Sequence, residues 1–194
     1  MRRVRRCQNI CIPINQVNLI FDSRTTWRDL TVWLRSYVHT KQGGLGDLDA
    51  IKEKLNAVLV KSTNIFSLIF GEQSADEYVD LWNNFINYYD KLIEAQISGD
   101  METVNKNKEK LQENSVQTAW FLAHINPYWT ESEWIELLSL YNQMSIDQST
   151  ALLNKDDKKD IYGFDKLLTL SSRIGDYYSQ GILDYLIYTS RVMT

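Results

Sequence analysis

Proline and cysteine are both scarce in this 194-residue chain, which has two of each. Proline interrupts helix interiors, so the single proline after Pro13, Pro127, favours long helices joined by short loops. An all-β or loop-rich fold would need more turn residues. The two cysteines, Cys7 and Cys11, are too few for a disulfide-stapled scaffold. They also have no nearby histidine or cysteine partners at zinc-binding spacing.

Long apolar runs and a large excess of one charge are also missing. No stretch approaches the ~20 consecutive apolar residues of a membrane-spanning helix, and the N-terminal segment lacks the apolar centre of a secretory signal. We therefore expect a cytoplasmic protein. The net charge of −4 does not predict nucleic-acid binding. Four arginines nevertheless gather at the N-terminus, which suits either a solvated tail or a contact with an anionic partner: Arg2, Arg3, Arg5 and Arg6.

What the sequence does contain is an aromatic-rich apolar pattern with helical spacing. Hydrophobic residues make up 44% and aromatic residues 12% of the chain, which is typical of a folded core. From Thr26 onward, apolar residues recur every three or four positions, with breaks at glycine, aspartate and proline. This spacing predicts helices over about 26–42, 47–58, 76–98, 100–124, 130–152 and 160–188, with a short apolar stretch at 65–70.

We interpret these segments as one all-α domain over residues 25–190, an up-down bundle of about six helices, ferritin-like or four-helix-bundle-like. Residues 1–24 are set apart as an N-terminal arm whose order the sequence leaves open. Isoleucine alternates with other residues at positions 10, 12 and 14, a pattern compatible with extended chain. Gly175 and Gly181 interrupt the last helix and indicate a kink or a close helix contact.

A faint internal repeat of about 55 residues runs through the helical region. Trp27 and Trp82 begin similar helical stretches (82 − 27 = 55), and Gly46-Asp47 aligns with Gly99-Asp100 (99 − 46 = 53). A third copy begins near Leu137. This pattern predicts duplication of a helical hairpin, whose apolar face is buried only when the copies pack together.

No catalytic or metal-binding motif emerges from the pattern. A ferritin-type di-iron site needs Glu-x-x-His pairs, whereas His39 and His124 follow Ser36 and Phe121 at that spacing. The glycine-rich run at 43–46 lacks the preceding strand and the following Lys-Ser/Thr of a phosphate loop. The sequence therefore predicts no catalytic residue, no metal ligand and no cofactor.

One aromatic cluster stands apart because it lies in a predicted loop. Tyr128 and Trp129 follow Asn126-Pro127, where helix packing does not explain two large aromatic side chains, and Trp134 comes early in the next helix. Two roles fit this cluster: it covers the end of the bundle, or it lines a pocket. For the second role, Tyr128, Trp129 and Trp134 are the candidate ligand or partner surface.

The run Phe121-Leu-Ala-His-Ile-Asn-Pro-Tyr-Trp129, followed by Glu133-Trp134, resembles a family of small helical proteins from spore-forming, low-GC bacteria. The resemblance spans about Thr26 to Leu186 and implies a helical bundle. The family pattern places a histidine three residues after the repeated tryptophan, where this chain has Leu30 and Phe85. Some members carry the label acetylglutamate kinase. We reject that activity because it needs an α/β sandwich and a glycine-rich phosphate site, which this sequence lacks.

We therefore predict a non-enzymatic binding or interaction module whose partner is a protein or a small apolar ligand, and a homodimer is one form of such an interaction. The competing prediction is a ferritin-like metal- or ligand-binding enzyme. Inward carboxylates would then replace the missing histidines, with these candidates: Asp29, Asp90 and Glu136. The two predictions differ in whether acidic side chains converge inside the bundle.

Overall fold

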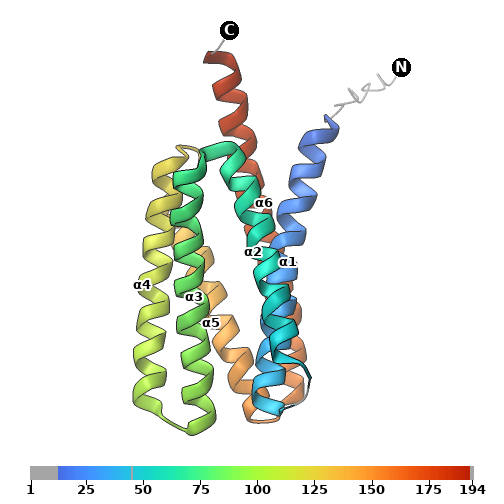
Figure 1. Cartoon of the computed structure of the whole chain (residues 1–194), viewed down its shortest axis with the longest axis vertical. Coiled ribbons are helices and arrows are strands. Elements are labelled where there is room, and N and C mark those ends of the chain that lie inside the picture. The colour runs from blue at the N-terminus through green and yellow to red at the C-terminus, as the bar shows by residue number, and fades with distance from the viewer. Residues whose placement is uncertain (1–12, 45, 193–194) are drawn as a thin grey trace, which may run out of the picture.

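The computed structural model describes residues 13–44 and 46–192. In this part of the chain, six helices follow one another: α1 (Ile14–Gly43), α2 (Leu48–Phe70), α3 (Glu72–Ser98), α4 (Met101–Ile125), α5 (Glu131–Leu153) and α6 (Asp157–Val192). They run alternately up and down, and both ends of the described chain lie at the same end of the bundle (Figure 1). The predicted all-α, up-down bundle is confirmed.

The six helices form a closed ring. Each helix packs against the next one along the chain, and α6 returns to pack against α1. The helices α1, α3 and α5 also contact one another across the centre. The fold therefore consists of three hairpins, α1–α2, α3–α4 and α5–α6, whose first helices meet in the middle. All three hairpin turns lie at the end of the bundle opposite the two termini (Figure 1).

The second helix of every hairpin begins with the same kind of cap. Asp47, Asp100 and Asp156 each accept a hydrogen bond from the backbone N–H three residues further on, at 3.0, 3.1 and 3.2 Å. A carboxylate in this position satisfies a helix N–H that has no partner inside the helix, and it also interacts favourably with the helix dipole. The short turns are therefore specified by one aspartate each.

Helix α1 is longer than the sequence predicted. It begins at Ile14, directly after Pro13, so residues 14–24 continue the bundle helix and do not form a separate extended arm. Proline suits this position, because a helix start leaves its N–H groups without partners. This end of α1 projects beyond α2 (Figure 1), and Ile14 and Phe21 are exposed there, so the usual apolar stripe is missing. Residues 1–12, including both cysteines, lie outside the described residues.

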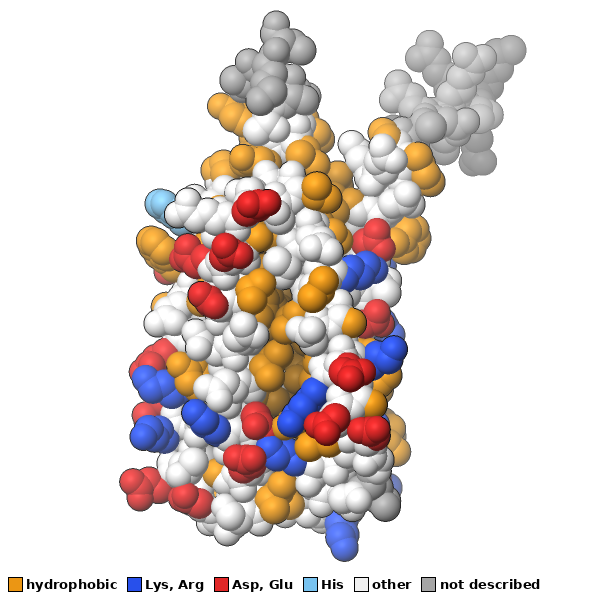
Figure 2. Space-filling view, viewed as in Figure 1, with side chains coloured by type: hydrophobic (Ala, Val, Ile, Leu, Met, Phe, Trp, Pro, Cys, Tyr) orange, Lys and Arg blue, Asp and Glu red, His pale blue; other side chains and the backbone are white. Residues whose placement is uncertain are grey.

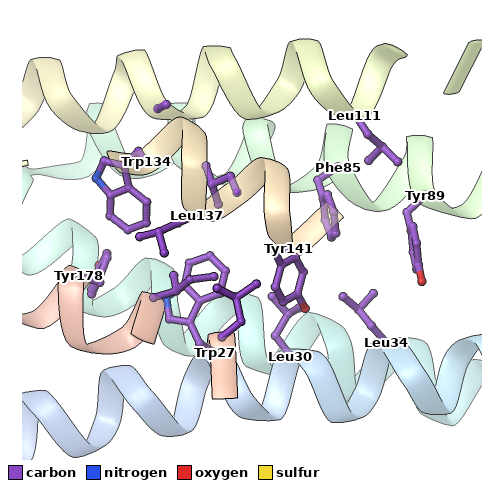
Figure 3. Packing of buried hydrophobic residues seen from close by; sticks show 14 of the residues in the cluster. Trp27, Leu30, Leu34, Phe85, Tyr89, Leu111, Trp134, Leu137, Tyr141 and Tyr178 are labelled. Carbon is purple, nitrogen blue, oxygen red and sulfur yellow. The ribbon is translucent and has the colours of Figure 1, made fainter. Parts of the chain in front are cut away.

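Aromatic side chains fill the centre of the bundle (Figure 3). The ring of Trp27 in α1 lies 5.2 Å from that of Trp82 in α3 and 6.1 Å from that of Tyr141 in α5, between centroids. Phe85 of α3 lies 6.3 Å from Tyr141. The three inner helices are thus joined by ring contacts: Trp27 belongs to the buried core, and half-buried Trp82 packs against it.

Helices α1 and α6 pack with their backbones unusually close. A β carbon built on Gly175 of α6 would lie 2.7 Å from the Cα of Arg24 in α1, nearer than real side chains come. Glycine is therefore required here for close approach, which confirms one of the two interpretations of Gly175. Further along the same pair of helices, Arg35 of α1 forms an ion pair with Asp160 of α6, which is 4% exposed.

Candidate functional site

The aromatic loop closes one end of the bundle. The side-chain oxygen of Asn126 accepts a hydrogen bond from the Tyr128 N–H, and the Asn126 carbonyl accepts one from the Trp129 N–H, both at 3.0 Å. These two bonds fold the loop back on itself, as is typical of an asparagine turn. The Thr130 N–H then donates to the Tyr177 hydroxyl at 2.7 Å, which ties the loop to α6.

The structure separates the three residues that the sequence suggested as a surface. Trp129 and Trp134 lie in the core, 2% and 0% exposed, while Tyr128 is 40% exposed. The Trp129 indole N–H donates to the Tyr177 carbonyl at 3.3 Å, and its ring stacks on Tyr178 at 5.2 Å. Trp129 and Trp134 are therefore packing residues at the end of the bundle, and only Tyr128 of the three is exposed.

The three candidate carboxylates do not converge. Asp29 is half-buried in α1, Glu136 is exposed on α5, and Asp90 of α3 is already bound by Lys41 and Tyr37. Among the described residues, no group of three or more His, Cys, Asp or Glu side chains is placed to hold a metal ion. The central positions that a di-metal bundle would use are filled by aromatic rings. The described part of the chain therefore offers the competing prediction no metal site.

Both histidines lie at the surface. His124 stacks on Trp120, with ring centroids 5.1 Å apart. The Nε2 atom of His39 lies 3.7 Å from an oxygen of Asp160, and Arg35 binds the same carboxylate. Burial and the nearby Arg35 lower the pKa of His39, although Asp160 acts in the opposite direction. The lowered pKa favours the neutral form of His39.

A small pocket lies among α1, α3, α4 and α5. It holds about 30 Å³, and aromatic rings including Trp82 and Tyr141 form much of its wall. Among the polar groups beside it, Asn142 donates to the Leu111 carbonyl at 3.0 Å and to Ser115 at 2.8 Å, whereas the buried indole N–H of Trp82 has no hydrogen-bond partner among the described residues. A space of this size accommodates about one water molecule. It is too small for a metabolite.

The candidate site is an open groove between α1, α2 and α3, which we call the α2/α3 groove. It has a volume of about 280 Å³. Its floor is apolar, and Figure 2 shows hydrophobic side chains along the hollow between α2 and α3. The residues of the floor are buried except for half-buried Ile86: Leu34, Leu55, Leu59, Ile86 and Tyr89.

Amide side chains line both walls of the α2/α3 groove. Asn56 comes from α2, and Asn83 and Asn87, one helical turn apart, come from α3. All three are exposed, and none makes a hydrogen bond to another described residue. Each amide offers one acceptor oxygen and two donor hydrogens. The walls can therefore bind either kind of polar group without breaking a bond of the fold.

One end of the α2/α3 groove is charged. Lys41 binds Asp90 and also Glu94, the latter at 2.9 Å, and the Tyr37 hydroxyl donates to Asp90. Burial and the bond to Asp90 raise the pKa of Tyr37 to about 12. Burial lowers the pKa of Lys41, but its bonds to Asp90 and Glu94 outweigh this effect and raise that pKa. Lys52, which also lines the groove, makes no ion pair with a described residue.

The α2/α3 groove is not predicted by the helical pattern of the sequence, although one signal of it is present. Asn83, Asn84 and Asn87 lie close together in a helix, and asparagine is a poor helix former. Amides that weaken a helix and are not caps suggest a role outside the fold. The apolar floor gave no signal, because its residues look like any other core positions.

No protein-family model, curated protein or solved structure matches the chain. In the described residues, no helix is long and apolar enough to span a membrane.

Proposed function

We propose that the protein is a non-enzymatic binding module that holds a small apolar ligand in the α2/α3 groove. The observation that carries this proposal is an apolar floor flanked by three amides that bond to no described residue: Asn56, Asn83 and Asn87. Small-molecule sites typically combine apolar walls with a few polar groups that fix orientation. The volume of about 280 Å³ suits a small ligand.

The internal repeat supports this choice of site. The three inner helices end at Gly43, Ser98 and Leu153, which are 55 positions apart in both steps (98 − 43 and 153 − 98). On this basis the three hairpins are copies of one ancestral hairpin, which the shared aspartate caps also favour. Copies packed in a ring meet at three seams, namely α2/α3, α4/α5 and α6/α1.

The seams differ in how they are closed. At the α4/α5 seam, Asn142 of α5 donates to Leu111 and Ser115 of α4. Its counterpart one repeat earlier is Asn87 (142 − 87 = 55), which is exposed and lines the α2/α3 groove. At the α6/α1 seam, Gly175 lets the two backbones touch. Of the three seams, only α2/α3 has an asparagine at this position whose side chain makes no hydrogen bond across the seam. Such an asparagine is available to bind a ligand in the groove.

The groups around the groove favour binding over catalysis. The lining side chains of the α2/α3 groove include no Ser, Cys or His. The raised pKa of Tyr37 keeps its hydroxyl protonated at neutral pH, and Asp90 is engaged by Lys41. Tyr37, although bonded to Asp90, is therefore not an activated nucleophile. Lys52 remains free to bind the anionic or strongly accepting end of an otherwise apolar molecule.

Titration with anilinonaphthalene sulfonate, an apolar fluorescent probe with an anionic end, tests the proposal. Asn83→Trp fills the α2/α3 groove from its wall, whereas Asn84→Trp adds the same ring at an exposed position beside it. We expect one saturable site in the wild type and in Asn84→Trp, and at least about tenfold weaker binding in Asn83→Trp, a difference of ~1.4 kcal/mol. Equal binding by both variants would place the probe elsewhere and refute the proposal.

A further inference from the structure

Helix α4 displays the one tryptophan that the fold leaves exposed. Trp120 is 53% exposed, whereas the other five tryptophans are buried or half-buried. Its ring lies nearly parallel to that of His124, at 10° and 5.1 Å. Val116, one turn earlier on the same face, is also exposed. An indole held by stacking on its own helix offers a large contact surface that loses little freedom when a partner binds.

Trp120 forms one wall of an open pocket of about 400 Å³ between α3, α4 and the start of α5. Its apolar lining comes from Leu81 and exposed Val116, and its acidic lining comes from two exposed residues, which we call the rim glutamates, Glu77 and Glu131. Neither glutamate forms an ion pair with a described residue. The pocket is reached from the α4 side of α3 and shares no residue with the α2/α3 groove.

The chain around this pocket is free of basic residues over long stretches. Residues 62–90 and 111–154 contain no Lys or Arg, yet they include Asp76, Asp80 and Glu133 in addition to the two rim glutamates. Figure 2 shows acidic side chains, without Lys or Arg, over the part of α3 and α4 nearest the α2–α3 turn. Such a surface attracts cations and repels nucleic acids and anionic membranes.

We propose that the surface formed by Trp120, Glu77 and Glu131 docks a basic peptide segment of a partner protein, with an arginine side chain stacked on Trp120. A guanidinium is planar, stacks on aromatic faces and donates paired hydrogen bonds to carboxylates. The two rim glutamates provide such carboxylates. A free quaternary amine is less well matched, because the cages that retain such amines surround them with several aromatic rings. Here a single indole faces an open pocket.

Fluorescence anisotropy with a labelled Gly-Arg-Gly-Arg-Gly peptide at low ionic strength tests this proposal. Trp120→Ala should weaken binding about two- to fivefold, the usual effect of an exposed cation–π contact. Glu77→Gln should weaken it to a similar degree, and the lysine version of the peptide should bind less tightly than the arginine version. Because both positions are exposed, neither change should disturb the fold.

Two matched variants separate a site from general attraction. Tyr162→Ala removes an exposed aromatic ring from α6, and Glu136→Gln removes an exposed acid from α5 outside the pocket. Both should bind the peptide as the wild type does. The proposal fails if Trp120→Ala binds the peptide as tightly as Tyr162→Ala does. It also fails if Glu136→Gln weakens peptide binding as much as Glu77→Gln does, because the peptide would then be held by net charge alone.

The arginines of the chain itself could compete with the peptide. Peptide binding is therefore also measured in a chain in which all four N-terminal arginines are changed to alanine, both with Trp120 and with Trp120→Ala. The four arginines are Arg2, Arg3, Arg5 and Arg6. We expect the same fold-change in both backgrounds. Loss of the Trp120 effect in the arginine-free background would contradict the proposal.

Discussion

The indole of Trp129 lies against the backbone of Gly181, at a position where a β carbon on Gly181 would come within 2.0 Å of Trp129 Nε1. No real side chain can occupy that space. The glycine in α6 and the tryptophan in the 126–130 loop are therefore a matched pair, although 52 positions separate them (181 − 129). The close contact seats the indole that covers the end of the bundle.

Gly181→Ala should destabilise the protein by about 1–3 kcal/mol, the usual cost of overpacking a filled site. The indole cannot move aside easily, because it stacks on Tyr178 and packs edge-to-face on Trp134. Gly163→Ala is the control, since a β carbon there meets nothing within 4 Å, and it should stabilise α6 by about 0.5–1 kcal/mol. Urea unfolding measures both. A neutral Gly181→Ala would contradict the pairing.

The third hairpin turn carries lysine where the second has glycine. The N–H groups of Asp100 and Asp156 donate to the carbonyls of Ala95 and Ala151, at 2.9 Å in both turns. The residue before each aspartate has a positive φ, 76° in Gly99 and 56° in Lys155. This left-handed conformation is unfavourable for any residue with a β carbon.

Lys155→Gly should therefore stabilise the protein by about 0.5–1 kcal/mol, since the gain in turn geometry exceeds the added flexibility of the unfolded chain. The reciprocal change, Gly99→Lys, should destabilise it by a similar amount. Thermal unfolding followed by circular dichroism measures both. If both changes shift the midpoint in the same direction, the two turns are not equivalent.

The charged end of the α2/α3 groove predicts a loss of stability at high pH. The pKa of Tyr37 is raised from 10.0 to about 12 in the folded protein. The contribution of this raised pKa to the free energy of unfolding is complete below pH 10 and is lost as pH rises to about 12, because Tyr37 releases its proton at lower pH in the unfolded chain than in the folded protein. In this window one such group changes the free energy of unfolding by at most ~1.4 kcal/mol per pH unit.

Tyr37→Phe should make the decline in stability between pH 10 and pH 12 shallower than in the wild type. At neutral pH the same variant should lose about 1 kcal/mol, because the bond to Asp90 disappears. Urea unfolding at a series of pH values gives both numbers. Parallel stability curves above pH 10 would show that Tyr37 keeps its ordinary pKa.

Much of the fold could be predicted from local signals. Glycine, aspartate and proline at the turns marked the boundaries of α3, α4 and α5 to within a few residues, because these residue types act on the backbone directly. The start of α1 could not be predicted in this way. Its first turns project past the bundle, so Asn15 and Asn18 replace the apolar stripe that periodicity requires.

The surface features were harder to predict than the helices. An exposed Trp120 and a buried Trp129 look alike in a sequence, since both are large aromatic residues near a helix end. The two tryptophans differ in what surrounds them in the fold. Trp129 is buried because Gly181 of α6 leaves space for its indole, and α6 lies near the loop only in the folded protein. The α2/α3 groove has the same origin, because a space left between helices is not encoded in any one of them.

Asn142 and Asn87 provide a paired test of the seams, because each lies in the first helix of its hairpin and 55 positions separate them (142 − 87). Asn142→Ala removes two hydrogen bonds to α4 at a buried position and should destabilise the protein by about 1–3 kcal/mol. Asn87→Ala should change stability by less than about 0.5 kcal/mol, since the side chain of Asn87 is exposed and makes no hydrogen bond to a described residue. The same Asn87→Ala variant should bind the groove probe more weakly. Equal destabilisation by the two variants would mean that Asn87 closes its seam as Asn142 does, and the groove would then lose its distinguishing feature.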